Sequence, residues 1–278
     1  MRLGFIDYYL DEWHANNYPN WICEASGGSC EVAYAYGQIS SPFTGVTSGQ
    51  WCESNGIILC DSIEELIEKS DGIIVLSPDN CEKHEELCQL PLRSGKRVYV
   101  DKTFAPDLPA AKRIFAIAEE NDTPCYSTSA LRFAEEYMTV DRSAITAVNC
   151  WGPNDFETYS IHQLEPMMML MGTAAKRVLF TPGEGCYQML VDFEDGRFGS
   201  ISGYQGGSPF MANIALHAGA QLINVQSDFF HNFIFELVDF FQNGTIKVSH
   251  EETLRIMAVR GAGLQAAESP GKWINVES

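Results

Sequence analysis

The chain has few basic residues and no long apolar run, and both absences narrow what it can do. Its 278 residues contain 18 lysines and arginines against 37 acidic residues, which gives a formal net charge of −19. Nucleic acids and anionic membrane surfaces are bound by clustered basic side chains, so neither is an expected partner. No apolar run approaches the roughly 18 residues of a membrane-spanning helix, so no membrane span is expected.

The cysteines lack a regular pattern. There are nine of them, an odd number, and no two form a Cys-x-x-Cys pair. A secreted disulfide framework and a zinc ribbon both need regular spacing, so neither is expected and no metal site is predicted. Free thiols are typical of a reducing compartment. The apolar run of the first predicted strand comes directly after Met1-Arg2, so no signal peptide is expected. We therefore expect a cytoplasmic protein.

The first part of the chain alternates short apolar runs with helical patterns. Such alternation predicts right-handed crossovers and a parallel sheet whose ligands bind at the carboxyl ends of the strands. Residues 38–56 are rich in Gly, Ser, Thr and Pro, so a segment without regular secondary structure is expected there. The expected strands are 3–6, 31–36, 57–59, 72–76, 97–100 and 124–127. The expected helices are 11–20, one that begins at Asp61 or Ser62, 80–94 and 108–121.

The pattern changes after about residue 128. Apolar alternation and turn residues predict antiparallel strands at 145–151, 177–180, 187–193, 198–204 and 211–216. Helices are expected at 160–171, 229–243 and 249–267. The fold class is therefore α/β. Residues 1–128 are expected to form a Rossmann-like domain of the dinucleotide-binding type, and residues 129–278 an α+β domain with an open antiparallel sheet.

Candidate binding residues follow two of the predicted parallel strands. Asp101 and Lys102 come directly after strand 97–100, where a lysine can hold a substrate hydroxyl or help to move a proton. An ordinary surface lysine explains the position equally well. After strand 72–76, Ser77 and Pro78 make a turn, and Asp79 or Asn80 caps the next helix. A helix N-terminus at this edge can also hold an anionic or polar ligand group.

A second group of candidates lies on the predicted helix 160–171. His162 and Glu165 are three residues apart and share a face. A neutral imidazole can take a hydroxyl proton near pH 7, and Glu165 would orient the ring or simply cap it. Asp155, just upstream, can join the same polar cluster. The alternative is a helix histidine that is bound to a backbone carbonyl.

The order and spacing of these elements resemble the Gfo/Idh/MocA family, which includes glucose-fructose oxidoreductase and inositol dehydrogenase. The family has a P-N…H motif, which compares with Pro78, Asn80 and His84, and then A-G-K-H-V-x-x-E-K-P, which compares with the segment 94–102. The helix that carries His162 is similar to the family's D-x-G-x-H-x-x-D element. The resemblance extends over nearly the whole chain.

The resemblance implies an NAD- or NADP-dependent oxidoreductase that acts on a secondary alcohol of a sugar, cyclitol or related polyol. His162 would remove the hydroxyl proton, Lys102 would hold that oxygen, and the motif's final acid maps onto Glu165. The small-molecule substrate would be the main partner, in a homodimer or homotetramer paired through the C-terminal sheet. The implied cofactor-binding residues are Asp7, Tyr9, Ser77, Pro78, Asn80, Asp101 and Lys102.

The largest departure from the family lies after the first strand. In the family, the glycines of a Gly-x-Gly-x-x-Gly motif allow a tight turn and let the backbone approach the pyrophosphate closely. In this chain the three glycine positions are occupied by Asp7, Tyr9 and Glu12. After the second strand, Gly37-Gln38 stand where an acid would bind the ribose. An acidic side chain within about 4 Å of a diphosphate charge costs about 4 kcal/mol at an effective dielectric near 20.

Smaller departures affect the other motifs. In the family's D-x-G-x-H-x-x-D element, the positions of the first acid and the glycine correspond to Thr158 and Ser160 of this chain. Asp155 is the nearest acidic residue that could replace the missing acid. At the position of the proline in the family's Glu-Lys-Pro motif, this chain has Thr103. A cis bond before a residue other than proline costs about 2.5–4 kcal/mol, so a trans bond is expected there.

Three functions fit these residues. The leading hypothesis is an NAD(P)-dependent oxidoreductase with an altered cofactor loop. The second is an enzyme of the same fold that does not use the dinucleotide and performs acid–base chemistry, such as elimination or epimerisation, on a sugar or cyclitol. The third is a non-catalytic relative that binds a sugar-like ligand.

Overall fold

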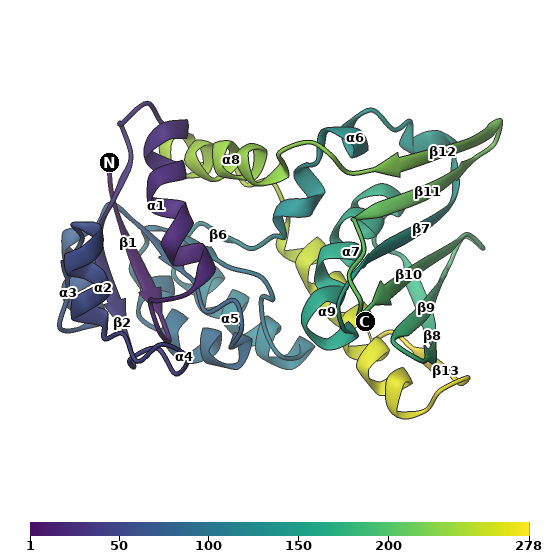
Figure 1. The fold of residues 1–278 in the computed structure, drawn as a ribbon, viewed down its shortest axis with the longest axis horizontal. Helices are drawn as coiled ribbons and strands as arrows, with labels where there is room; N and C mark the ends of the chain where they lie inside the picture. Colours follow the sequence, from purple (N-terminus) through teal and green to yellow (C-terminus); the bar gives the residue numbers. More distant parts are fainter. Residues whose placement is uncertain (278) are drawn as a thin grey trace. The chain divides into compact units, whose positions relative to one another are not determined.

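The computed structural model describes residues 1–277 and divides the chain into two compact units. The first unit comprises residues 1–128 and 231–250, and the second comprises 129–230 and the residues from 251 onward. Most of helix α8 (Phe229–Asn243) therefore returns to the first unit, where Phe233 packs against Tyr18 (Figure 1). No helix within residues 1–277 has both the length and the apolar character needed to cross a bilayer. The nine cysteines form no disulfide.

The first unit is built on a six-stranded parallel sheet in the order β3-β2-β1-β4-β5-β6. The Rossmann-like expectation is confirmed. Strand order reverses between β1 and β4, and in such sheets this is where ligands bind. The strands are β1 (Arg2–Asp7), β2 (Glu31–Gly37), β3 (Ile58–Leu59), β4 (Gly72–Val75), β5 (Arg97–Val100) and β6 (Cys125–Tyr126).

Helices connect these strands, and their starting points follow from capping residues. Ser62 accepts a hydrogen bond from the backbone of Glu65 and Asp107 accepts one from Ala110, so each satisfies an N–H that the helix leaves unpaired. The helices of the first unit, besides α8, are α1 (Trp13–Ala25), α2 (Ser48–Asn55), α3 (Ile63–Lys69), α4 (His84–Cys88) and α5 (Leu108–Glu120).

Two predicted segments differ from the structure. The segment 38–56, expected to be irregular, contains α2, because Thr47 and Gln50 form a capping box. The expected helix 80–94 is broken into α4 and two 3₁₀ turns, at Cys81–Lys83 and Pro91–Arg93. Pro91 cannot continue a helix, because it lacks an N–H and its ring clashes with the preceding turn.

The second unit contains a seven-stranded sheet in the order β12-β11-β7-β10-β9-β8-β13. The expectation of an antiparallel sheet is correct for five of its pairs, but β7 and β10 pair in parallel. The edge strands β12 and β13 were not predicted. The strands are β7 (Ile145–Pro153), β8 (Ala175–Gly183), β9 (Cys186–Phe193), β10 (Phe198–Tyr204), β11 (Met211–Leu216), β12 (Gly219–Asn224) and β13 (Trp273–Asn275).

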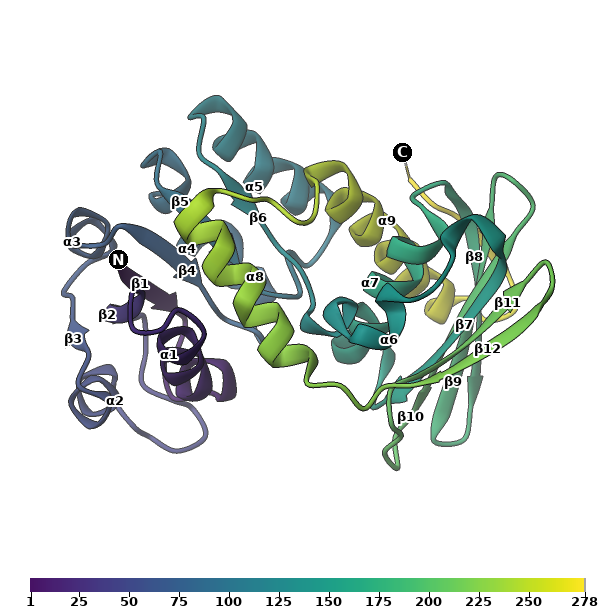
Figure 2. The same ribbon diagram turned by 90° about the horizontal axis from the view of Figure 1, so that it is seen from above.

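One face of this sheet is covered and the other is open. Helices α7 (Phe156–Met171) and α9 (His250–Glu268) supply Met167 and Ile256 to the core that covers the first face. Figure 2 shows both helices on the same side of the sheet. The opposite face carries four exposed large side chains: Trp151, Phe198, Tyr204 and Leu222. A short helix, α6 (Glu135–Met138), lies near β12.

The peptide bond between Lys102 and Thr103 is cis. The expectation of a trans bond is therefore wrong. That expectation rested on the intrinsic preference of a bond that precedes a residue other than proline. Thr103 and Phe104, which follow Lys102, are both buried.

Candidate functional site

Three of the predicted cofactor-binding residues meet at the carboxyl edge of the parallel sheet. Asp7 ends β1, and its Oδ1 accepts a hydrogen bond of 2.9 Å from the hydroxyl of Ser77, just beyond β4. The same hydroxyl accepts a hydrogen bond of 2.9 Å from the backbone N–H of Tyr8. Asp101 follows β5, and its Oδ1 accepts a hydrogen bond of 3.2 Å from Tyr99. Asp7 and Ser77 are thus bonded to each other, whereas the carboxylate of Asp101 is bonded to Tyr99.

Glu12 occupies the start of α1. One oxygen of its carboxylate accepts the backbone N–H of His14 at 2.7 Å, and the other accepts the N–H of Ala15. These N–H groups lie in the first turn of the helix, where the macrodipole attracts an anion. Glu12 is only 8% exposed. The anion-binding position of α1 is therefore filled by the chain's own carboxylate.

The imidazole of His14 lies between two carboxylates. Its Nδ1 is 3.2 Å from Oδ2 of Asp101 and 3.5 Å from Oε2 of Glu12. All three side chains are more than nine-tenths buried. The contact joins the start of α1 to the residue that precedes Lys102. Neither His14 nor Glu12 was predicted as a site residue in its own right.

The buried carboxyl of Asp7 favours its neutral form. It is 1% exposed, and its Oδ2 has no hydrogen-bond partner among the described residues. Burial, and next the charge of Glu12, raise the pKa of Asp7 well above its usual value, against the opposing hydrogen bond from Ser77.

Aromatic side chains fill the rest of the β1–α1 loop. Tyr9 is only 4% exposed, and its hydroxyl lies 3.4 Å from Oδ2 of Asp79. Its ring meets Tyr8 and the exposed Phe43 edge-on, at centroid distances of 6.2 and 5.9 Å. The ammonium of Lys83 lies 4.7 Å from the centroid of the Tyr8 ring. Bulky side chains stand where a bound pyrophosphate needs bare backbone.

These residues do not fit a dinucleotide in the usual position. The N–H groups at the start of α1 are already accepted by Glu12, and Tyr9 stands at the position of the second glycine. Beyond β2, Gln38 stands at the position of the ribose-binding acid, and its amide donates a hydrogen bond of 2.6 Å to Glu86.

The remaining predicted residues of the first unit have mainly structural contacts. Asn80, next to the partly buried Pro78, begins a 3₁₀ turn and donates its amide to Glu82 at 3.0 Å. The buried ring of His84 contacts the carbonyls of Leu76 and Phe104, and so links the loops after β4 and β5. Lys102 is partly buried at the second of these loops.

His162 lies on α7 in the second unit and is partly exposed. Its Nδ1 is 2.7 Å from the hydroxyl oxygen of Ser129. The rings of Tyr159 and Phe210 meet the imidazole edge-on, at centroid distances of 5.2 and 5.9 Å. A hydroxyl partner and two aromatic rings thus orient the side chain.

The two acids predicted beside His162 have other partners. Glu165 is buried and accepts a hydrogen bond of 2.9 Å from Arg132, which also pairs with Glu252. Asp155 caps α7 by accepting from the N–H and the hydroxyl of Thr158, at 2.9 and 2.8 Å. Partial burial works against the ionised form of Asp155, but these bonds outweigh it and hold its pKa below the usual value. Both acids stabilise the second unit.

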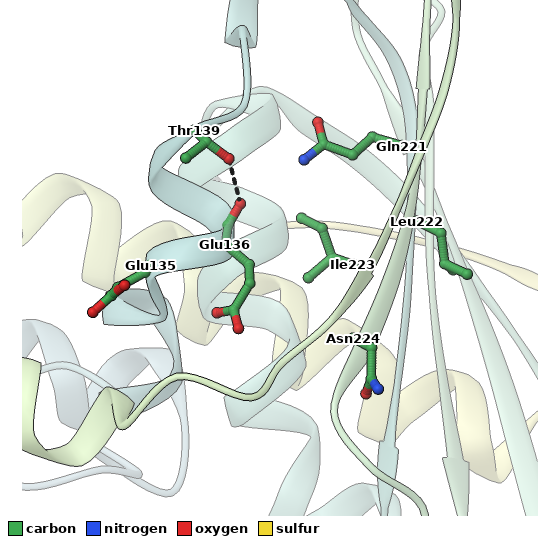
Figure 3. A pocket seen from close by; sticks show the side chains of 7 residues that line it. All are labelled: Glu135, Glu136, Thr139, Gln221, Leu222, Ile223 and Asn224. Carbon is green, nitrogen blue, oxygen red and sulfur yellow. Dashed lines mark hydrogen bonds between the residues drawn. The ribbon is translucent and has the colours of Figure 1, made fainter.

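The second unit also contains an open hollow of about 530 Å³ between α6 and β12 (Figure 3). Glu136, at its wall, accepts hydrogen bonds from the hydroxyl of Ser227 and from the backbone N–H groups of Gln226 and Ser227. Partial burial opposes ionisation, but these bonds prevail and lower the pKa of Glu136 to about 2. The carboxylate thus ties α6 to the segment after β12. The other residues that line the hollow are Glu135, Thr139, Gln221, Leu222, Ile223 and Asn224.

Comparisons with known proteins agree with this architecture. Residues 19–129 match the sequence profile of the Gfo/Idh/MocA family, described as "Oxidoreductase family, NAD-binding Rossmann fold". The matched segment begins after β1 and the loop that contains Glu12. No curated protein sequence matches the chain.

Solved structures share the fold over the full chain at low sequence identity. A probable dehydrogenase from Thermotoga maritima has 13% identity and a TM-score of 0.81, with 99% of each chain covered. Myo-inositol 2-dehydrogenase from Lactobacillus plantarum has 14% identity and a TM-score of 0.81, again with 99% of each chain covered. An oxidoreductase from Agrobacterium radiobacter, solved with NAD+, L-tartaric acid and magnesium, has 14% identity and a TM-score of 0.79, with 99% of this chain and 98% of that chain covered. Residues 19–129 are thus similar to the Gfo/Idh/MocA family of oxidoreductases, and the whole chain has the fold of these solved dehydrogenases and oxidoreductases.

Proposed function

We propose that the protein is an enzyme that acts on a sugar, cyclitol or related polyol, and that His162 moves a proton of that substrate. The observation that carries the proposal is the setting of this imidazole, which is partly exposed and oriented by Ser129. Imidazole changes its charge near neutral pH and is the side chain most often used for general acid–base catalysis. The solved relatives include an inositol dehydrogenase, which favours a polyol substrate.

Acid–base chemistry without a dinucleotide is the reaction that the first unit favours. Epimerisation beside a carbonyl removes a C–H proton and returns it to the opposite face. Elimination removes a C–H proton and releases a neighbouring hydroxyl as water. Neither reaction needs an external oxidant, which suits a β1–α1 loop that Glu12 and Tyr9 occupy.

The second candidate is oxidation or reduction of a secondary alcohol with NAD or NADP. It is favoured by the family match over residues 19–129 and by the NAD+ bound to the Agrobacterium radiobacter relative.

Proton exchange with solvent separates the two candidates. The purified protein is incubated in D₂O with inositols, aldoses and their keto forms, with and without NAD+ or NADP+, and followed by NMR. We expect deuterium to enter a C–H position, or water to be lost, without added dinucleotide. Turnover that strictly requires NAD(P) would establish the second candidate instead. An absence of turnover in every arm would rule out the proposed enzyme.

We also propose that the protein forms a homodimer or homotetramer through the open face of the second unit's sheet. Trp151, Phe198, Tyr204 and Leu222 expose apolar surface on that face, and contiguous apolar surface marks an interaction site. In sedimentation velocity, the wild type is expected to be dimeric or tetrameric, and the variant Trp151→Glu/Phe198→Glu monomeric. Phe43→Glu, which changes an exposed phenylalanine of the first unit, should leave the assembly intact. A monomeric wild type would contradict this proposal.

A further inference from the structure

We infer that Glu12 is a built-in replacement for the diphosphate of a dinucleotide, so that the first unit does not bind NAD or NADP at the start of α1. Two carboxylate oxygens accept two consecutive N–H groups of the first helical turn. These are the groups that a dinucleotide's pyrophosphate uses in a Rossmann fold. A diphosphate could bind them only if the Glu12 side chain left its site.

The surroundings of Glu12 hold it in place. Its Oε2 lies 3.5 Å from Nδ1 of His14, and the same nitrogen lies 3.2 Å from Oδ2 of Asp101 at the end of β5. The cluster spans two elements of the sheet edge and is almost completely buried. Moving Glu12 away would therefore also break the contacts around His14.

The neighbouring side chains oppose a dinucleotide independently of Glu12. Tyr9 packs between Tyr8 and Phe43 and is 4% exposed, so it cannot rotate away without exposing its ring. Asp7 fills the first glycine position and is bonded to Ser77. Since an incoming diphosphate carries two negative charges, it would meet a buried carboxylate as well as a steric barrier.

Direct titration with the dinucleotide tests the inference without a polyol substrate, and therefore separately from the proposed reaction. NADH and NADPH are titrated into the full-length protein, and binding is followed by nicotinamide fluorescence and by calorimetry. The variants are Glu12→Gly, Glu12→Gln and Asp7→Gly/Tyr9→Gly/Glu12→Gly. Glu12→Gln is the matched control, since it removes the charge but keeps the shape of the side chain.

We expect no saturation of the wild type at about 1 mM NADH or NADPH, which corresponds to an affinity too weak to hold the cofactor. The triple variant should bind at least about tenfold more tightly than the wild type, because it restores bare backbone and the free N–H groups. Glu12→Gly should bind more tightly than Glu12→Gln, because glutamine still fills the position. A wild-type dissociation constant below about 0.1 mM would overturn the inference.

Thermal unfolding keeps the inference testable if the triple variant does not fold. Glu12→Ala removes a buried helix cap and should lower the melting temperature by about 2–4 °C or more. An unchanged melting temperature would show that Glu12 does not hold the start of α1, and would also overturn the inference. The partly buried acid of the same loop, in the variant Asp11→Ala, serves as the control and should shift the transition less, because it accepts hydrogen bonds from the side chains of Asn16 and Thr44 and does not cap the helix.

Discussion

Replacement of His162 by alanine is expected to lower turnover by about 10²–10⁴-fold, the usual contribution of a general acid or base. The side chain is partly exposed, so its removal should leave little unsatisfied polar surface and should change the free energy of unfolding only slightly. The rate of solvent-deuterium incorporation, measured under saturating substrate, gives the effect on the proton-transfer step. A variant that keeps the wild-type rate would exclude His162 from this role.

Ser129 provides a graded control for the same prediction. Its hydroxyl lies 2.7 Å from Nδ1 of His162, so it positions the ring and need not touch the substrate. Ser129→Ala should keep a measurable rate but shift the pH at which the rate is half-maximal, because a hydrogen-bond partner of the titrating imidazole is lost. Tyr159→Phe retains the ring that contacts the imidazole and should have nearly the wild-type pH profile.

The central strands of the parallel sheet could be predicted from the sequence because they are buried on both faces. Unbroken apolar runs such as Gly72–Val75 are a strong local signal, and β5 has the predicted bounds. Edge strands give a weaker signal. Strand β12 begins with two small residues, Gly219 and Ala220, and has a single buried residue, so it lacks a regular alternation of buried and exposed positions. Strand β13 has only three residues. Their pairing partners, rather than their composition, make them strands.

The site could be predicted only where its partners are near in sequence. The spacing of His162 and Glu165 places them on one helix, but it contains no information about Arg132, which is 33 residues away and pairs with Glu165. The sequence likewise identifies Glu12 as the occupant of a glycine position. That its carboxylate turns back onto the N–H groups of α1 follows from side-chain packing, and glutamate is not among the preferred capping residues.

Removal of the Arg132 guanidinium, in the variant Arg132→Ala, should reduce the free energy of unfolding of the second unit by about 3–5 kcal/mol. Arg132 and Glu165 are both almost fully buried, and Arg132 also pairs with Glu252. Loss of the arginine removes the ion pair that the buried Glu165 carboxylate makes with Arg132, and the cost of burying the carboxylate without this pair exceeds the net value of the intact pair. The change in the free energy of unfolding is measured by urea denaturation, with hydrogen exchange of the α7 amides as the probe of the second unit.

Two further variants separate the buried charge from the loss of side-chain volume. Arg132→Met/Glu165→Leu replaces both buried partners with apolar groups and should recover much of the stability, because the carboxylate that still loses Arg132 is that of Glu252, whose side chain is 22% exposed and can be hydrated. Arg113→Ala breaks an ion pair of 2.6 Å with Glu85, but the two side chains are 57% and 32% exposed, so the loss should cost much less stability than Arg132→Ala. Equal losses for Arg132→Ala and Arg113→Ala would contradict the prediction, because they would mean that water screens the Glu165 carboxylate as well as it screens the exposed Glu85.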